Sequence, residues 1–258
     1  MERLVDKPLA GRRIAVTRAR HQARTLADRI EEFGGEIIEF PTVEIRPVPF
    51  MVDHSAAYDW IVFTSANAAR TFAQGLPAAP AATFPRAKVC VVGPATAKAA
   101  RDSGFRVDLQ PENFIAEGVL EAFWAHDVRG KRFLLPRANI ARDFLPNVLR
   151  ESGANVTEIV VYETRCPNVT DADVETFIAK KPDAVMFTSS STAANFAAIL
   201  GRDRIRQSLS GTIFASIGPE TTKSARAAGV HISVEAERHD VGGLVAALVR
   251  WAQGEALN

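Results

Sequence analysis

Short runs of hydrophobic residues alternate along this chain with segments whose apolar residues recur at helical spacing. Ile14-Ala15-Val16 is one such run, and segment 22–33 after it places Leu26, Ile30 and Phe33 on one helical face. Strands that are apolar throughout are typical of parallel sheets covered by helices on both faces. The pattern therefore predicts a doubly wound α/β architecture.

The same alternation of strand and helix continues to the end of the chain. The strands that we expect are 14–16, 37–40, 60–63, 89–92, one around Val107, 133–135, 156–161, 184–187, 213–217 and 232–234. The helices that we expect are 22–33, ended by Gly34-Gly35, one from Ala66, 95–103, 116–124, 140–151, 191–200, 221–228 and 241–251.

Three motifs of the first half return in the second half in the same order. Segments 11–19, 59–65 and 92–96 recur as 130–138, 183–189 and 217–221, at offsets of 119, 124 and 125 residues. We therefore expect two structurally similar domains. A cleft between such domains is where a ligand usually binds.

Two β-prone segments occupy equivalent places in the two halves and end in proline. They are residues 41–49 and 160–167. Proline suits extended connections better than the interior of a sheet. If both segments run between the domains, one domain must be inserted into the other.

Composition narrows the class of protein. The 258 residues are 47% hydrophobic and 24% charged, with a net charge of +1. This balance argues against a broad surface for nucleic acid or membrane, and leaves room for a local anion site. The sequence has no apolar run near the roughly 18 residues of a membrane helix, and no signal-peptide core. We expect a soluble, cytoplasmic protein.

Several familiar kinds of chemistry have no signal in the sequence. Two cysteines, Cys90 and Cys166, cannot form a disulfide framework or a zinc site by themselves, and the five histidines lack metal-ligand spacing. Gly-x-Gly-x-x-Gly, phosphate-loop and Gly-x-Ser-x-Gly motifs are missing as well. We predict chemistry that needs no metal, nucleotide cofactor or strong nucleophile.

Four repeated loops follow expected strands and enter expected helices. Two carry hydroxyl residues, 63–67 and 187–191, and two carry Gly-Pro turns, 93–96 and 218–221. Ligands of parallel α/β domains gather at the carboxyl ends of the strands, where helix N-termini offer N–H groups to anions. The alternative is that the Ser and Thr side chains only cap helices.

Arginine and tyrosine add further candidates. Arg18 and Arg137 follow the first strand of each repeat, and a guanidinium can bond both oxygens of a carboxylate. The alternative for either arginine is a surface ion pair. Tyr162, one of only two tyrosines, lies in the second expected linker and is a candidate for the site. The alternative for this tyrosine is that its ring only packs at the linker.

Taken together, these motifs resemble the uroporphyrinogen-III synthase family over nearly the whole chain. The resemblance rests on residues 16–18, 63–67, 92–96, 135–137, 161–164, 187–190 and 217–221. It implies two flavodoxin-like domains with parallel sheets, joined by a two-stranded linker. Domain 1 would comprise 1–40 plus 168–258, domain 2 would be 47–159, and the linker strands would be 41–46 and 160–167. Ala69 departs from the branched aliphatic residue usual in the family.

The resemblance also implies a reaction without cofactor. The linear tetrapyrrole hydroxymethylbilane loses water and closes with inversion of its last ring, giving uroporphyrinogen III for haem, sirohaem and cobalamin synthesis. Tyr162 would help the hydroxyl to leave, because a phenol keeps its proton at neutral pH. Substrate carboxylates would bind to Ser65, Thr96, Ser189 and Thr221, with Thr17, Arg18, Asn67, Arg137, Thr188 and Ser190 as further candidates. Glu220 would compete with a bound anion, so we expect it to point away from the cleft.

Two other functions fit the same features. A non-catalytic protein could close two α/β lobes on an anionic ligand, and only turnover distinguishes it from an enzyme. A regulatory module that senses a metabolite would normally add a DNA-binding helix pair or a basic face, and the sequence contains neither. The sequence has no apolar segment beyond those of the expected domains that would indicate a protein interface, so we expect a monomer.

Overall fold

The computed structural model describes residues 7–53, 56–113, 116–123, 126–141 and 143–255, and it divides the chain into two compact units. Unit 1 comprises Met1–Glu44 and Arg165–Asn258, and unit 2 comprises Ile45–Thr164. The divisions after Glu44 and Thr164 fall inside the two segments expected as linkers.

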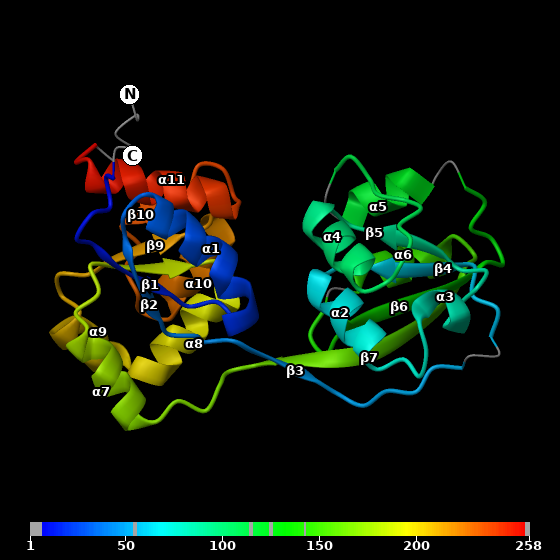
Figure 1. The fold of residues 1–258 in the computed structure, drawn as a ribbon, viewed down its shortest axis with the longest axis horizontal. Helices are drawn as coiled ribbons and strands as arrows, with labels where there is room; N and C mark the ends of the chain where they lie inside the picture. Colours follow the sequence, from blue (N-terminus) through cyan, green and yellow to red (C-terminus); the bar gives the residue numbers. More distant parts are fainter. Residues whose placement is uncertain (1–6, 54–55, 114–115, 124–125, 142, 256–258) are drawn as a thin grey trace. The chain divides into compact units, whose positions relative to one another are not determined.

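Unit 1 is built on a five-stranded sheet in the order β10-β9-β8-β1-β2, and every neighbouring pair of strands is parallel (Figure 1). The strands are β1 (Arg13–Val16), β2 (Glu36–Glu39), β8 (Ala184–Phe187), β9 (Ile213–Ser216) and β10 (Val234–Glu235). Numbered in order of appearance within the unit, these strands run 5-4-3-1-2 across the sheet. The parallel α/β pattern that the apolar runs predict is confirmed.

Helices cover both faces of this sheet. α1 (Arg20–Glu32) and α11 (Val241–Ala252) pack Leu26, Ile30 and Leu244 against one face. The other face carries α7 (Asp171–Ala179), α8 (Ser190–Leu200), α9 (Arg202–Ser208) and α10 (Pro219–Ala227), around an aromatic core that includes Phe187 and Phe196. The strands are buried on both sides, which explains why their sequences are apolar throughout.

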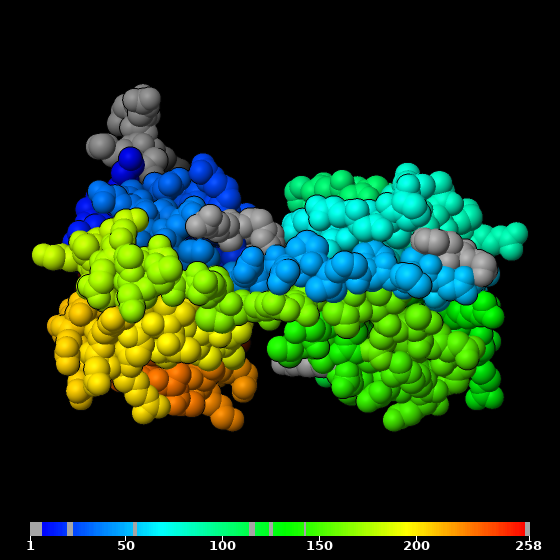
Figure 2. All heavy atoms as spheres, turned by 90° about the horizontal axis from the view of Figure 1, so that it is seen from below, coloured from blue at the N-terminus to red at the C-terminus, as the bar shows by residue number. Residues whose placement is uncertain are grey.

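Unit 2 has a second five-stranded sheet, in the order β3-β7-β6-β4-β5. Its strands are β3 (Glu44–Pro47), β4 (Trp60–Phe63), β5 (Lys88–Val91), β6 (Arg132–Ala138) and β7 (Asn155–Arg165). The β7–β6, β6–β4 and β4–β5 pairs are parallel, and Leu109 adds a single bridge beside Cys90. Figure 2 shows the blue β3 segment alongside the green β7 segment at the surface.

The helices of unit 2 also form two layers. α2 (Ala66–Gln74), α3 (Pro80–Thr83) and α4 (Pro94–Asp102) cover one face of the sheet, where Phe63 and Phe72 are fully buried. α5 (Ala116–Phe123) and α6 (Phe144–Glu151) cover the other face, around Phe133. The elements that carry the repeated motifs hold matching places in the two sheets, since β6, β7, β4 and β5 follow the order of β1, β2, β8 and β9.

Some expected elements differ from the structure. The helix expected over 140–151 begins only at Phe144, and Ile140 lies in the preceding loop with 77% of its surface exposed. The strand expected around Val107 is reduced to the bridge at Leu109. Helices α3, α7 and α9 were not predicted. α7 carries a readable signal, since Thr170 and Asp173 form a capping box at its start.

The segment expected as the second linker is largely part of a sheet. β7 continues to Arg165, and Val160 and Tyr162 pair with Arg137 and Ala138 of β6. Val161 is fully buried, and Tyr162 is 6% exposed in the core of unit 2. Tyr162, expected in a linker strand, therefore belongs to β7 of unit 2, whose apolar side chains extend the sheet.

Candidate functional site

The carboxyl ends of the strands carry most of the predicted site residues. In unit 1, β1 leads to Thr17-Arg18, β8 leads to Thr188-Ser189, and β9 leads to the Gly218-Pro219 turn. In unit 2, β4 leads to Ser65, and β5 leads to Gly93-Pro94. Because the strands of a parallel sheet share one direction, these turns lie at one edge of each sheet.

Ser65 and Tyr162 form a hydrogen-bonded pair within unit 2. The Ser65 Oγ and Tyr162 hydroxyl oxygens are 3.1 Å apart, and either can be the donor. Ser65 Oγ also accepts a hydrogen bond from the backbone N–H of Ala68, at 3.1 Å, as the N-cap of α2. The serine thus caps a helix and holds the only polar atom of the tyrosine side chain, so the capping alternative and a role beside Tyr162 are compatible.

Ser189 and Ser190 have clear structural partners in unit 1. Ser189 caps α8, accepting from the Thr192 N–H at 3.3 Å, while the Thr192 hydroxyl accepts from the Ser189 N–H. The Ser190 hydroxyl donates to the backbone carbonyl of Glu220 at 3.1 Å and so joins α8 to α10. The Glu220 side chain is exposed.

Thr96 and Thr221 occupy matching positions in the two units. Each is the third residue of a helix, α4 or α10, which starts with proline after Gly93 or Gly218. Glycine has no side chain with which to cap the first N–H groups, and these groups lack intrahelical acceptors. Thr96 is 5% exposed and Thr221 4% exposed, and neither hydroxyl bonds to another residue within the described ranges. Both helix starts therefore retain hydrogen-bonding capacity for an anion.

Two of the predicted substrate contacts are occupied within the protein. Thr17 is fully buried, and its hydroxyl donates to the Met186 carbonyl at 2.7 Å, so it ties β1 to β8 and is closed to a ligand. The Arg137 guanidinium pairs with Glu158 and with Asp143, the latter at 2.8 Å. Both residues therefore have partners inside the fold, and a direct carboxylate contact for either one stays a prediction.

The remaining predicted residues are Arg18, Thr188 and Asn67. Arg18 is partly buried, its burial lowers the pKa of the guanidinium, and it makes no ion pair or hydrogen bond to any residue that the structure describes. Thr188 and Asn67 are partly buried, at the turn after β8 and in the first turn of α2.

Sequence reasoning missed a polar chain beside α10. The Ser216 hydroxyl, fully buried at the end of β9, lies 2.5 Å from the Thr222 hydroxyl, which donates to the carboxylate of Glu235. The Thr221-Thr222 pair was the available signal, but nothing local predicts that Glu235 meets it. This series of hydrogen bonds anchors the first turns of α10.

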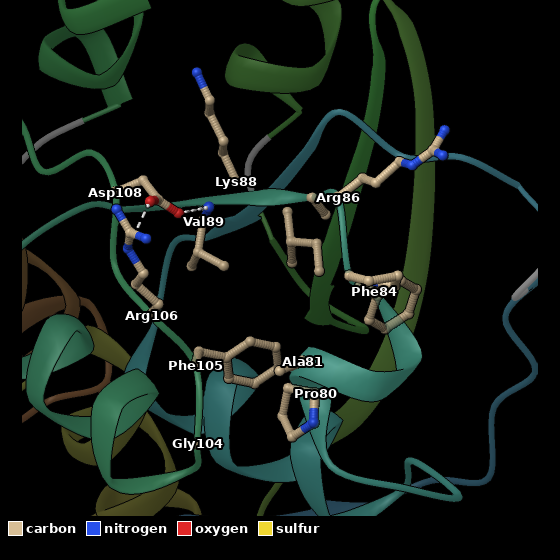
Figure 3. A pocket seen from close by; sticks show the side chains of 13 residues that line it. Pro80, Ala81, Phe84, Arg86, Lys88, Val89, Gly104, Phe105, Arg106 and Asp108 are labelled. Carbon is tan, nitrogen blue, oxygen red and sulfur yellow. Dashed lines mark hydrogen bonds and ion pairs between the residues drawn. The ribbon is translucent and has the colours of Figure 1, made fainter.

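A separate cavity of about 360 Å³ lies at the opposite end of the unit 2 sheet (Figure 3). It lies beside Lys88, the first residue of β5, and Arg106 there pairs with Asp108 at 3.2 Å. Asp108 also accepts from the backbone N–H of Val89 at 2.9 Å. The cavity is therefore remote along the strand from the turns that carry Ser65 and Thr96.

The described part of the chain contains no group of three or more His, Cys, Asp or Glu residues suited to a metal ion. None of the helices within these residues is long and apolar enough to cross a membrane.

The fold and these turns define an α/β protein whose helix N-termini and neighbouring hydroxyls suit an anionic ligand. The family model of uroporphyrinogen-III synthase HemD matches residues 24–246. The chain belongs to the uroporphyrinogen-III synthase family. A uroporphyrinogen-III synthase of Synechococcus elongatus is 34% identical, over 97% of this chain and 99% of the relative. One of Chlorobaculum parvum is 29% identical, over 88% of this chain and 94% of the relative.

Solved structures share the fold. The uroporphyrinogen-III synthetase of Helicobacter pylori superposes with a TM-score of 0.70 at 19% identity, covering 93% of this chain and 99% of that protein. A mutant uroporphyrinogen III synthase of Thermus thermophilus gives 0.57 at 16% identity, over 95% and 100% of the two chains. The family resemblance that the sequence motifs carry is thereby confirmed.

Proposed function

We propose that this chain converts hydroxymethylbilane into uroporphyrinogen III, with loss of water and inversion of the last pyrrole ring. Family membership supports this reaction. The structural observation that carries it is the matched pair Thr96 and Thr221, at helix starts that no side chain caps, whose hydroxyls bond to no other residue that the structure describes.

The chemistry of the substrate suits these helix starts. Hydroxymethylbilane carries eight carboxylates, which backbone N–H groups and hydroxyls can hold without a large positive charge on the protein. The net charge of +1 is compatible with such binding. Each carboxylate at a helix N-terminus also gains from the helix dipole. We assign Thr96 and Thr221 as direct contacts, with Asn67, Thr188 and the capped turns at Ser65, Ser189 and Ser190 as neighbouring contacts.

The protein must direct ring closure as well as bind the substrate. Without an enzyme, closure gives the isomer in which the last ring is not inverted. The rate of the inverting path rises only if the protein binds its transition state better than the extended substrate. Tyr162, held by Ser65, would donate a hydrogen bond or a proton to the departing hydroxyl.

Thr17 and Arg137 take another role in this proposal. Thr17 holds the end of β1 against β8, and Arg137 holds Asp143 and Glu158 together. Both would position their loops rather than touch the substrate. Arg18, the counterpart of Arg137, has no such partner among the described residues.

We further propose that each unit is a flavodoxin-like domain. The strand order of unit 1, 2-1-3-4-5 read from β2, is the order of that fold. In unit 2, the row β7-β6-β4-β5 matches β2-β1-β8-β9 of unit 1 in space, although β4 and β5 precede β6 and β7 in the chain. A cytoplasmic monomer without cofactor, with unit 2 inserted into unit 1, completes this proposal.

Product isomer composition tests the function. Hydroxymethylbilane is generated in situ, the purified chain is added without metal or nucleotide, and the products are oxidised and separated by chromatography. Predominant uroporphyrin III is the expected result. Uroporphyrin I alone, at the rate of a control without protein, would overturn the proposal and favour a non-catalytic protein that binds an anionic ligand.

A further inference from the structure

Arg18 and Arg137 are equivalent by position in the two units. They lie 119 residues apart and follow β1 and β6, which hold matching places in their sheets. The strand register extends the match: Val16 pairs with Glu39 in unit 1, and Leu135 pairs with Glu158 in unit 2, again 119 residues apart. Each arginine therefore stands two residues beyond a position that pairs with a glutamate.

The arginine of unit 2 is fully engaged inside the protein. Its guanidinium pairs with Glu158 and with Asp143, and it also donates to the Ala141 carbonyl at 2.7 Å. Its side chain is only 12% exposed. Two carboxylates thus compensate the burial of this cation, as burial of a charge requires.

The arginine of unit 1 lacks both of these carboxylates. Glu39 is exposed and makes no ion pair within the described part of the chain. The position that corresponds to Asp143 is Arg24, a cation, and it pairs with Asp28 at 2.7 Å. Arg18 nevertheless remains partly buried, and its burial lowers the pKa of its guanidinium. A cation that loses hydration without gaining a counter-charge destabilises the folded protein.

The surroundings of Arg18 indicate what supplies the missing charge. Arg18 follows β1 directly, and the Thr17 hydroxyl fixes the end of β1 to Met186 of β8. The turn that follows β8 carries Thr188 and leads into α8. Arg18 therefore lies at the carboxyl edge of the unit 1 sheet, on the same edge as the starts of α8 and α10.

We propose that Arg18 is a specificity-determining residue that binds one carboxylate of the tetrapyrrole substrate, and that Thr17 positions it. The substrate carboxylate takes the place that Glu158 and Asp143 fill around Arg137. This inference rests on the proposed function for the identity of the ligand. A planar guanidinium can bond both oxygens of the carboxylate, which a lysine ammonium does less specifically.

Steady-state kinetics with hydroxymethylbilane test this role. Arg18→Gln is expected to raise KM for isomer III formation about 10- to 100-fold, in line with loss of a charge-assisted hydrogen bond. Arg18→Lys should recover part of the loss. Arg24→Gln is the matched control, since it removes a nearby arginine that is exposed and paired on the surface, and its KM should equal that of the wild type.

Thermal unfolding gives a second readout that does not depend on turnover. Citrate, a tricarboxylate, should raise the Tm of the wild type and of Arg24→Gln, and raise that of Arg18→Gln less. Without citrate, Arg18→Gln should melt no lower than the wild type, because an uncompensated cation has been removed. A lower Tm without citrate, or wild-type KM together with a wild-type citrate response, would overturn the proposal.

The two proposals fail in different ways. If the wild type produces no isomer III, the proposed reaction is wrong. The citrate measurement then still decides whether Arg18 is a carboxylate site: a response that depends on Arg18 supports the site, and one that does not depend on it overturns the site.

Discussion

The Tyr162 hydroxyl lies 3.1 Å from Ser65 Oγ, the same atom that caps α2. This relationship joins β7 to the turn after β4, two segments that are 97 residues apart in sequence. The phenol of a core residue is thereby directed to the carboxyl edge of the unit 2 sheet, where the proposed reaction needs a proton donor.

Tyr162→Phe tests the donor. The variant removes one hydroxyl and keeps the ring, so the free energy of unfolding should fall by about 1 kcal/mol, the contribution of one hydrogen bond. The kcat for isomer III should fall about 100-fold or more, the usual effect of removing a positioned acid. Both quantities can be measured on the same preparation, by chromatography and by urea unfolding. An unchanged kcat would remove Tyr162 from the reaction.

Ser65→Ala separates capping from orientation of the phenol. Loss of the N-cap should lower the free energy of unfolding by about 1 kcal/mol. Ser189→Ala removes the matching cap of α8 and should lower it by a similar amount. Only Ser65→Ala should be coupled to Tyr162→Phe: the double variant should have nearly the kcat of Tyr162→Phe alone. Fully additive losses would show that the two hydroxyls act independently.

Thr221→Ala tests the unused hydroxyl at the start of α10. Because the hydroxyl has no partner in the described protein, its removal should change the free energy of unfolding by less than about 0.5 kcal/mol. KM for hydroxymethylbilane should rise about tenfold through loss of a hydrogen bond to a carboxylate. Thr221→Ser keeps the hydroxyl and serves as the control. Wild-type KM in the alanine variant would make Thr221 an ordinary helix residue.

Glu158→Gln tests the internal role of Arg137. It leaves a largely buried guanidinium with weakened pairing, so the free energy of unfolding should fall by about 2 kcal/mol in denaturant titrations. Asp28→Asn, which breaks the exposed pair with Arg24, should change it by less than about 1 kcal/mol. Equal effects in the two variants would contradict the view that Arg137 is held inside the fold.

The two cysteines should differ in reactivity. Burial raises the pKa of the Cys90 thiol to about 12, while Cys166 is exposed and the pKa of its thiol is raised less strongly by partial burial. The thiolate is the reactive form, so at pH 8 Cys90 should not react in the folded protein. A thiol reagent should titrate one cysteine in the native state and two in denaturant, and the native reaction should speed up as pH rises. Two rapidly reacting native thiols would contradict the burial of Cys90.

Much of the fold could be read from local pattern. The apolar runs predicted parallel strands, and Gly34 ends α1 with a φ of +87°, a conformation that glycine adopts readily. Capping residues gave a less consistent signal for where helices begin. Thr170 and Asp173 announce α7 by their spacing, yet the short amphipathic α9 has only Ile205 buried and leaves little periodic signal.

Local sequence pattern predicts only part of the candidate site. The motifs located the turns that carry Ser65, Thr96, Ser189 and Thr221, because turns between strands and helices are encoded by nearby residues. The sequence could not distinguish Arg18 from Arg137, which look alike in their repeats. It also did not show that Tyr162 is buried, because that burial depends on β7 joining β6.

These distinctions depend on partners that are distant in sequence. Thr17 and the Met186 carbonyl that it contacts are 169 residues apart, and no periodicity along the chain records that hydrogen bond. Apolar spacing reflects which side of an element faces the core, and this is a property of neighbouring residues. Whether a polar side chain has a partner depends on which segments meet in space. Only the folded chain therefore separates Arg137, which is paired inside the protein, from Arg18, which has no counter-charge among the described residues.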